Sequence, residues 1–155
     1  MKNIYTFSII FTSCMLNLIT AYSDTIKITS EKLNINRDSN ISVFSGNVYA
    51  EDDNIKLWSD KISIFYDETK KNVYEIIAEK NVKIIVNEVT AYGNYSKYLI
   101  DNEELLMKGD VVVIEKDNKI RSDQLILDLV NSTSIMTAKT NSRVTAQINK
   151  VNNEQ

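Results

Sequence analysis

Residues 44–48 read Phe-Ser-Gly-Asn-Val and residues 59–62 read Ser-Asp-Lys-Ile, and both phrases return along the chain. Further copies of the Ser-Asp-Lys-Ile phrase begin at Ser30, Gly93 and Ser122, and further copies of the Gly-Asn-Val phrase end at Val82, Val111 and Val144. The first residues of one phrase are 29, 34 and 29 positions apart, and the valines of the other are 34, 29 and 33 apart. Two phrases that recur with the same spacing indicate a duplication. The domain contains two copies of a unit of about 63 residues, and each copy consists of two half-units.

Apolar side chains recur at every second position beside these phrases. The inward-facing set that we predict comprises Val48, Ile62, Ile64, Val82, Ile84, Val111, Val113, Leu125, Leu127 and Val144. Alternation over such runs is typical of strands with one buried face. Pieces rich in Asn and Asp, such as 36–40 and 67–72, separate the runs and suit turns. Eight or more short strands at this spacing predict an all-β domain, in the form of a sandwich, a roll or a barrel.

The composition excludes several functions. The chain has 155 residues, a formal charge of −3, no His and no Pro. This acidic balance argues against nucleic-acid binding, which needs a basic face. Without His, and with Cys14 as the single Cys, the usual ligands of zinc and the usual His- or Cys-based nucleophiles are missing. The acidic run 51–53 lacks the spacing of a calcium loop. We therefore expect no catalytic site, no metal and no cofactor.

The first 23 residues have the layout of a secretory signal peptide. Lys2 precedes an apolar stretch, and small residues, Ala21 and Ser23, stand at the third and first positions before Asp24. We expect export with cleavage after Ser23, a folded domain over residues 24–148 and a polar tail over 149–155. Retention of the leader as a membrane anchor is the alternative, although its apolar run is short and interrupted.

The sequence Phe44-Ser45-Gly46-Asn47-Val48, followed by Asp60-Lys61-Ile62, resembles the OstA-like family over about residues 26–148. The resemblance implies an antiparallel β-jellyroll that forms an open, V-shaped trough. It also implies a non-enzymatic periplasmic function, in which the trough shields the acyl chains of lipopolysaccharide between the inner and outer membranes. The inward-facing set above would then line the trough. Lys80 stands where the family often has Gly, which suggests one altered bulge.

The partners implied by the resemblance are lipopolysaccharide or a related lipid, inner- and outer-membrane transport subunits, and further copies of the chain joined head to tail. An open trough leaves unpaired backbone groups on its first and last strands. The predicted partner edges contain Ile26 and Ile28 at one end and Val144, Ala146 and Ile148 at the other. No Pro blocks either edge, which favours strand addition.

Two alternatives to a soluble lipid carrier remain open from the sequence. One is the membrane-anchored partner subunit of the same pathway. The other is a structural β-repeat domain that binds only protein.

Overall fold

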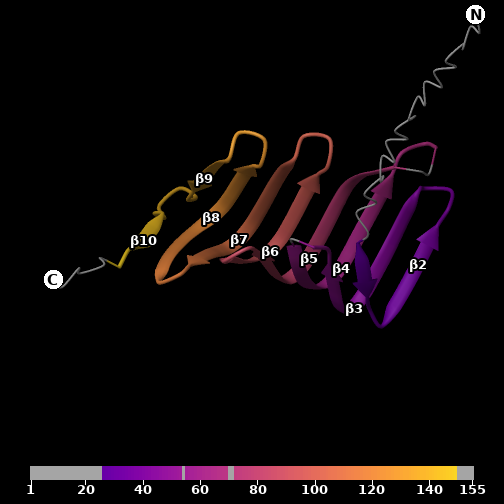
Figure 1. The fold of residues 1–155 in the computed structure, drawn as a ribbon, viewed down its shortest axis with the longest axis horizontal. Helices are drawn as coiled ribbons and strands as arrows, with labels where there is room; N and C mark the ends of the chain where they lie inside the picture. The colour runs from indigo at the N-terminus through magenta and orange to yellow at the C-terminus, as the bar shows by residue number, and fades with distance from the viewer. Residues whose placement is uncertain (1–25, 54, 70–71, 150–155) are drawn as a thin grey trace, which may run out of the picture.

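Ten strands form one antiparallel sheet in the computed structural model, which describes residues 26–53, 55–69 and 72–149 (Figure 1). The strands are β1 (Lys27–Thr29), β2 (Lys32–Asn36), β3 (Ile41–Glu51), β4 (Ile55–Tyr66), β5 (Val73–Val86), β6 (Val89–Leu99), β7 (Glu104–Glu115), β8 (Asn118–Asp128), β9 (Thr133–Thr137) and β10 (Thr145–Gln147). β3 to β8 lie side by side in chain order, β1 and β2 both pair with β3, and β9 and β10 both pair with β8. The predicted all-β class is confirmed, since the described residues contain no helix.

The six central strands are long, and each is interrupted near its middle. They contain 11 to 14 residues. The ladder shifts register at the repeated phrases, for example between Ser45 and Val48 and between Lys108 and Val111. The prediction of short strands was wrong here. In the six central strands the two phrases meet at a β-bulge, which bends a strand without ending it, so two predicted short strands are the halves of one bent strand.

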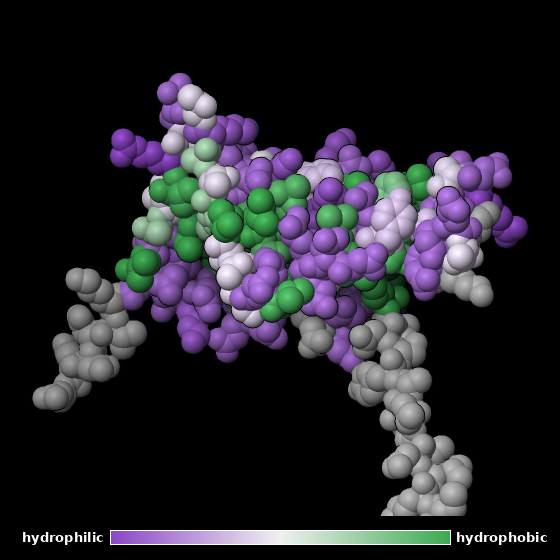
Figure 2. Space-filling view, turned by 90° about the horizontal axis from the view of Figure 1, so that it is seen from above, coloured by the Kyte–Doolittle hydropathy of each residue, from purple (hydrophilic) through white to green (hydrophobic). Residues whose placement is uncertain are grey.

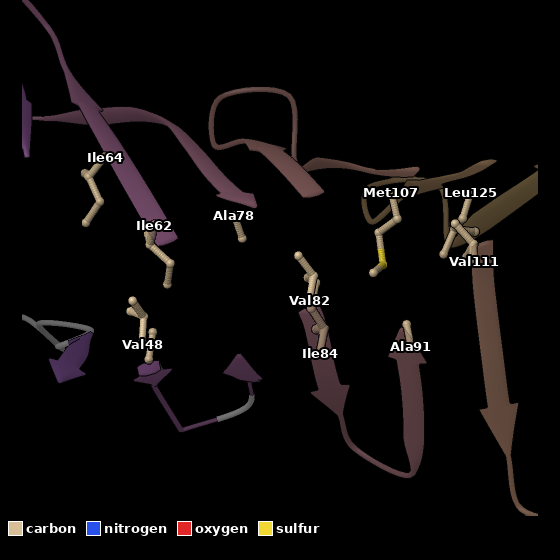
Figure 3. Close-up of a cluster of buried hydrophobic side chains, with 11 residues drawn as sticks. Val48, Ile62, Ile64, Ala78, Val82, Ile84, Ala91, Met107, Val111 and Leu125 are labelled. Carbon is tan, nitrogen blue, oxygen red and sulfur yellow. The ribbon is translucent and has the colours of Figure 1, made fainter. Parts of the chain in front are cut away.

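The bends divide the sheet into two walls that meet along one line and enclose a V-shaped trough. Wall A consists of segments 32–36, 41–45, 61–66, 73–79, 95–99, 104–108, 124–128 and 133–137. Wall B consists of segments 27–29, 48–51, 55–59, 82–86, 89–93, 111–115, 118–122 and 145–147. In Figure 3, Ile62 and Met107 from wall A point toward Val48 and Ala91, respectively, from wall B. The hydrophobic core therefore lies between the walls.

The serine of the Ser-Asp-Lys-Ile phrase has the same hydrogen bond in three copies. The Oγ atoms of Ser30, Ser59 and Ser122 donate to the backbone oxygens two residues further on, at 3.1, 3.1 and 3.0 Å. The fourth copy has Gly93, where a Cβ atom would lie only 3.3 Å from the Met107 methyl carbon and 3.3 Å from the Lys108 carbonyl oxygen. Close approach of the neighbouring strand therefore accounts for the missing serine.

The acidic residue of the same phrase ties neighbouring strands together across the bend. Asp60 accepts hydrogen bonds of 3.1 and 3.0 Å from the Asn81 side-chain amide. Glu31 accepts a bond from Asn47 in the same manner. The two repeated phrases thus meet on adjacent strands, which explains why they share one spacing along the chain.

The Gly-Asn-Val phrase supplies the backbone conformation of the bend. Gly46 and Asn47 have φ values of 80° and 45°, and Gly109 has a φ of 83°. This left-handed region is disfavoured for residues that carry a Cβ atom. Lys80 occupies the equivalent position with a φ of 64°, so the bulge persists there despite the missing Gly.

Replacing this lysine should therefore stabilise the protein. We expect Lys80→Gly to raise the free energy of unfolding by about 1 kcal/mol, because the left-handed conformation costs a non-glycine residue roughly that amount. Urea unfolding measures the change. Lys108→Gly, at an exposed strand position in a wall-A segment, serves as the control and should destabilise the protein. A loss of stability in Lys80→Gly as large as that in the control would contradict this account of the bend.

Candidate functional site

The inner faces of both walls carry cross-strand rows of side chains, most of them apolar and the others mainly serines. Beside the bend, the apex rows comprise Phe44, Ile62, Ala78, Ser96, Met107, Leu125 and Met136 in wall A and Val48, Ser59, Val82, Gly93, Val111 and Ser122 in wall B. Farther from the bend, the mouth rows comprise Ser42, Ile64, Ile76, Tyr98, Leu105 and Leu127 in wall A and Ala50, Leu57, Ile84, Ala91, Val113 and Ile120 in wall B.

The apex rows are packed tightly. Met107 and Val111 have no exposed surface, and Val48, Ile62 and Val82 are each 1% exposed. Complete burial of such a side chain stabilises a fold by about 1.5–3 kcal/mol. The apex rows therefore hold the two walls together.

The mouth rows become more accessible toward β7 and β8. Ile64 and Ile84 are buried, whereas Leu105, Val113, Ile120 and Leu127 are only half-buried. Figure 2 shows hydrophobic residues gathered toward the left of the view, with hydrophilic residues around them and only scattered hydrophobic ones over the rest of this face. An apolar surface of this kind gives acyl chains a non-directional place to bind.

The structure places nine of the ten predicted lining residues on the inner face. Val48, Ile62, Val82, Val111 and Leu125 lie in the apex rows, and Ile64, Ile84, Val113 and Leu127 lie in the mouth rows. Val144 is different, because it lies outside the strands and is 41% exposed. Sequence reasoning missed Met107 and Leu105, although their alternation before Lys108 was a usable signal.

The rims of the trough are polar and acidic. They are formed by the turns at the strand ends, which contain Asp52 in wall B and Glu103 in wall A. Burial raises the pKa of the Tyr98 hydroxyl, and the nearby charges of Glu103 and Asp52 raise it further. The carboxylates of Asp52 from wall B and Glu103 from wall A therefore both raise the pKa of this one tyrosine at the mouth of the trough. No set of three or more potential ligands is arranged to hold a metal ion within the described ranges.

The predicted partner edges consist of four short strands, two at each end of the sheet. Of the predicted edge residues, Ile28 lies in β1 and Ala146 in β10, while Ile26, Val144 and Ile148 lie just outside these strands. Sequence reasoning did not assign β2 and β9 to the edges. On β2, the inward-facing Leu33 and Ile35 are 49% and 60% exposed, so the apolar lining continues to the open end of the trough.

Asp123 fixes the segment that crosses from β9 to β10. Its carboxylate accepts hydrogen bonds from the Ser142 hydroxyl at 2.6 Å and from the Lys139 backbone N–H at 2.7 Å. These two bonds lower the pKa of Asp123. The crossing segment, residues 138–144, is otherwise largely exposed.

Loss of this carboxylate should release the crossing segment. We expect Asp123→Ala to speed amide hydrogen exchange over 138–149 and leave the central strands unchanged. Because the folded pKa is lowered, the ionised form stabilises the contact at neutral pH, and this contribution should fade as the pH falls below about 4. Asp60→Ala is the matched control, since Asp60 has the same place in the first unit. Equal exchange over 138–149 in both variants would show that Asp123 does not hold the segment.

The residues that bear on membrane attachment lie partly outside the structure. The predicted signal peptide over residues 1–23 lies outside the described residues, as does most of the predicted tail over 149–155. Within the described part of the chain, no helix has the length and apolar character needed to span a membrane.

A bent antiparallel sheet with an apolar interior, polar rims and open ends defines an all-β trough protein of the jellyroll class. Residues 27–133 match the family described as "LptA/(LptD N-terminal domain) LPS transport protein", and the chain belongs to this family. The predicted resemblance to the OstA-like family, of the LptA type, is confirmed.

Two individual proteins illustrate the similarity. The fold is similar to the crystal structure of LptH, the LptA homologous periplasmic component of the lipopolysaccharide transport device from Pseudomonas aeruginosa. The TM-score is 0.72 at 16% identity, covering 82% of this chain and 96% of that one. An uncharacterized protein of Rickettsia prowazekii (strain Madrid E) is 29% identical over 105 residues, which is 65% of this chain and 72% of the relative.

Proposed function

We propose that this chain is a non-enzymatic periplasmic carrier that shields the acyl chains of lipopolysaccharide, or of a related lipid, between the inner and outer membranes. The observation that carries the proposal is the mostly apolar inner face that both walls share. Shielding apolar surface from water is worth about 25 cal/mol per Å², so a lining of aliphatic side chains suffices to hold acyl chains. The family membership supports lipopolysaccharide as the lipid.

The burial pattern supports a division of the lining into two functional parts. The apex rows form the core, because Val48, Met107 and Val111 have at most 1% exposed surface. The half-buried mouth-row residues of β7 and β8 are the ones that contact acyl chains: Leu105, Val113, Ile120 and Leu127. A lipid therefore enters between the rims and does not displace the apex.

The topology supports head-to-tail extension of the trough. Each wall contains eight antiparallel segments, so its first and last segments run in opposite directions. A second copy placed end to end would then pair β9 with β2 and β10 with β1, both antiparallel. The same edges would serve the inner- and outer-membrane transport subunits by strand addition.

Direct binding of lipopolysaccharide to the mature chain tests the carrier function. Residues 24–155 should bind fluorescent lipopolysaccharide saturably, and a protein-binding structural domain should bind none. Mass spectrometry of the exported protein distinguishes the carrier from the remaining alternative, a membrane-anchored subunit. A chain that begins at Asp24 fits the carrier, whereas an intact Met1 would identify a membrane-anchored subunit.

A further inference from the structure

The outer faces of the two walls differ in charge. On wall B, the outward-facing strand positions carry five cations and one acid: Lys27, Lys56, Lys83, Lys119, Arg121 and Glu51. On wall A, they carry four cations and four acids: Lys32, Lys61, Lys97, Lys108, Glu75, Glu79, Glu104 and Asp128. Wall B thus presents a basic surface on a chain whose formal charge is −3.

Four of these eight charged residues on wall A are paired with one another. Lys61 Nζ lies 2.6 Å from a Glu79 carboxylate oxygen, and Lys97 Nζ lies 3.8 Å from Glu75. On wall B, the single outward-facing acid, Glu51, faces Lys27 at 3.9 Å. Lys83, Lys119 and Arg121 have no acidic neighbour in the cross-strand rows of wall B, so their charge is left to interact with something outside the strand ladder.

Aromatic rings lie among the cations of wall B. Tyr49, Trp58, Lys83 and Tyr92 are consecutive members of one cross-strand row. The ring centroids of Tyr49 and Trp58 are 5.0 Å apart, and Lys83 Nζ lies 4.7 Å from the Trp58 centroid and 6.0 Å from that of Tyr92. These contacts hold a cation and aromatic rings together on an accessible surface, where Tyr92 is 39% exposed.

We propose that the outer face of wall B rests on the surface of an anionic phospholipid bilayer. The excess of cations complements the negative potential of such a surface, to which each nearby Lys or Arg is attracted. Trp and Tyr are the side chains that prefer the membrane–water interface, since one part of each is apolar and the other polar. Eight segments about 4.8 Å apart give a face about 34 Å wide, which suits a flat surface better than a narrow polymer.

This contact is separate from lipid binding in the trough. The row of Tyr49, Trp58 and Tyr92 faces away from the inner rows that include Leu57 and Ala91. A trough lying with wall B on a membrane would therefore keep its mouth and both strand edges free.

Trp58 is the only tryptophan in the chain and reports on this face directly. We expect the mature protein to bind vesicles that contain phosphatidylglycerol, with a blue shift of Trp58 fluorescence, and to leave vesicles of pure phosphatidylcholine unbound. High salt should reverse the binding, because the attraction is screened.

Matched charge variants locate the binding face. Lys56→Gln with Arg121→Gln, on wall B, should weaken vesicle binding by about tenfold or more, since each cation near a membrane contributes substantially. Lys32→Gln with Lys108→Gln, on wall A, removes the same charge and should leave binding nearly unchanged. Circular dichroism checks that both variants fold.

Three results would overturn the proposal. The first is equal binding of the protein to both kinds of vesicle. The second is an equal loss of vesicle binding in the wall-A and wall-B variants. The third is an unchanged Trp58 fluorescence spectrum when the protein is bound. Binding to the soluble polyanion heparin without binding to vesicles would also overturn it, in favour of an anionic polymer. Because both variants leave the trough intact, lipid uptake into the trough affects them equally.

Discussion

Val111→Asp is expected to prevent folding. Val111 has no exposed surface and lies in the apex row of wall B, where the two walls pack. An aspartate there would be a buried carboxylate without a partner, which costs several kcal/mol whether it ionises or takes up a proton. Domains of this size have a total stability of only about 5–15 kcal/mol, so most of the native population would be lost.

The adjacent residue provides the control for this variant. Val112 points to the opposite face of the sheet and is only half-buried, so Val112→Asp should retain the native fold. Far-ultraviolet circular dichroism and urea unfolding of both variants measure the difference. Two variants of similar stability would contradict the assignment of the apex rows as the structural core.

Removal of residues 143–155 is expected to reduce head-to-tail oligomers to monomers. This truncation deletes β10 and leaves wall B with a final segment, β8, that runs parallel to the incoming β1 of a second copy. Antiparallel pairing would then be lost in one of the two walls, and the remaining β9 contact would have to support the joint alone.

Light scattering over a range of protein concentrations measures this effect. The full mature chain should form larger species as its concentration rises, while the truncated chain stays monomeric and keeps most of its β-content. If the full chain remains monomeric at millimolar concentration, self-stacking is wrong, and only pairing with other subunits remains as a function of these edges.

The alternation of apolar residues made much of the trough predictable. Ile62, Ile64, Val82 and Ile84 were placed on one face from period two alone, and they lie on the inner face of the structure. This periodicity predicts the buried face because a slip of one residue in register would move every apolar side chain of a strand to the opposite face. The family resemblance added the open trough, which local periodicity cannot specify.

The bend was the feature that local patterns concealed. A turn and a bulge both favour Gly and Asn at left-handed positions, so Gly46-Asn47 could not be distinguished from a chain reversal. The division of the lining into core and accessible mouth was also beyond the sequence. Val111 and Val113 alternate identically in the sequence, yet only Val113 remains half-buried, because exposure depends on the distance between the walls.

Photo-crosslinking at two neighbouring leucines of wall A tests the central claim most directly. Leu105 faces the trough from a mouth row, and Leu106 faces outward from the same strand, so the two sites differ mainly in the side of the sheet that they probe. A photoreactive residue at position 105 should capture lipopolysaccharide in a transporting cell, and one at position 106 should capture little or none. Equal capture at both positions, or capture at 106 alone, would show that the lipid does not travel in the trough.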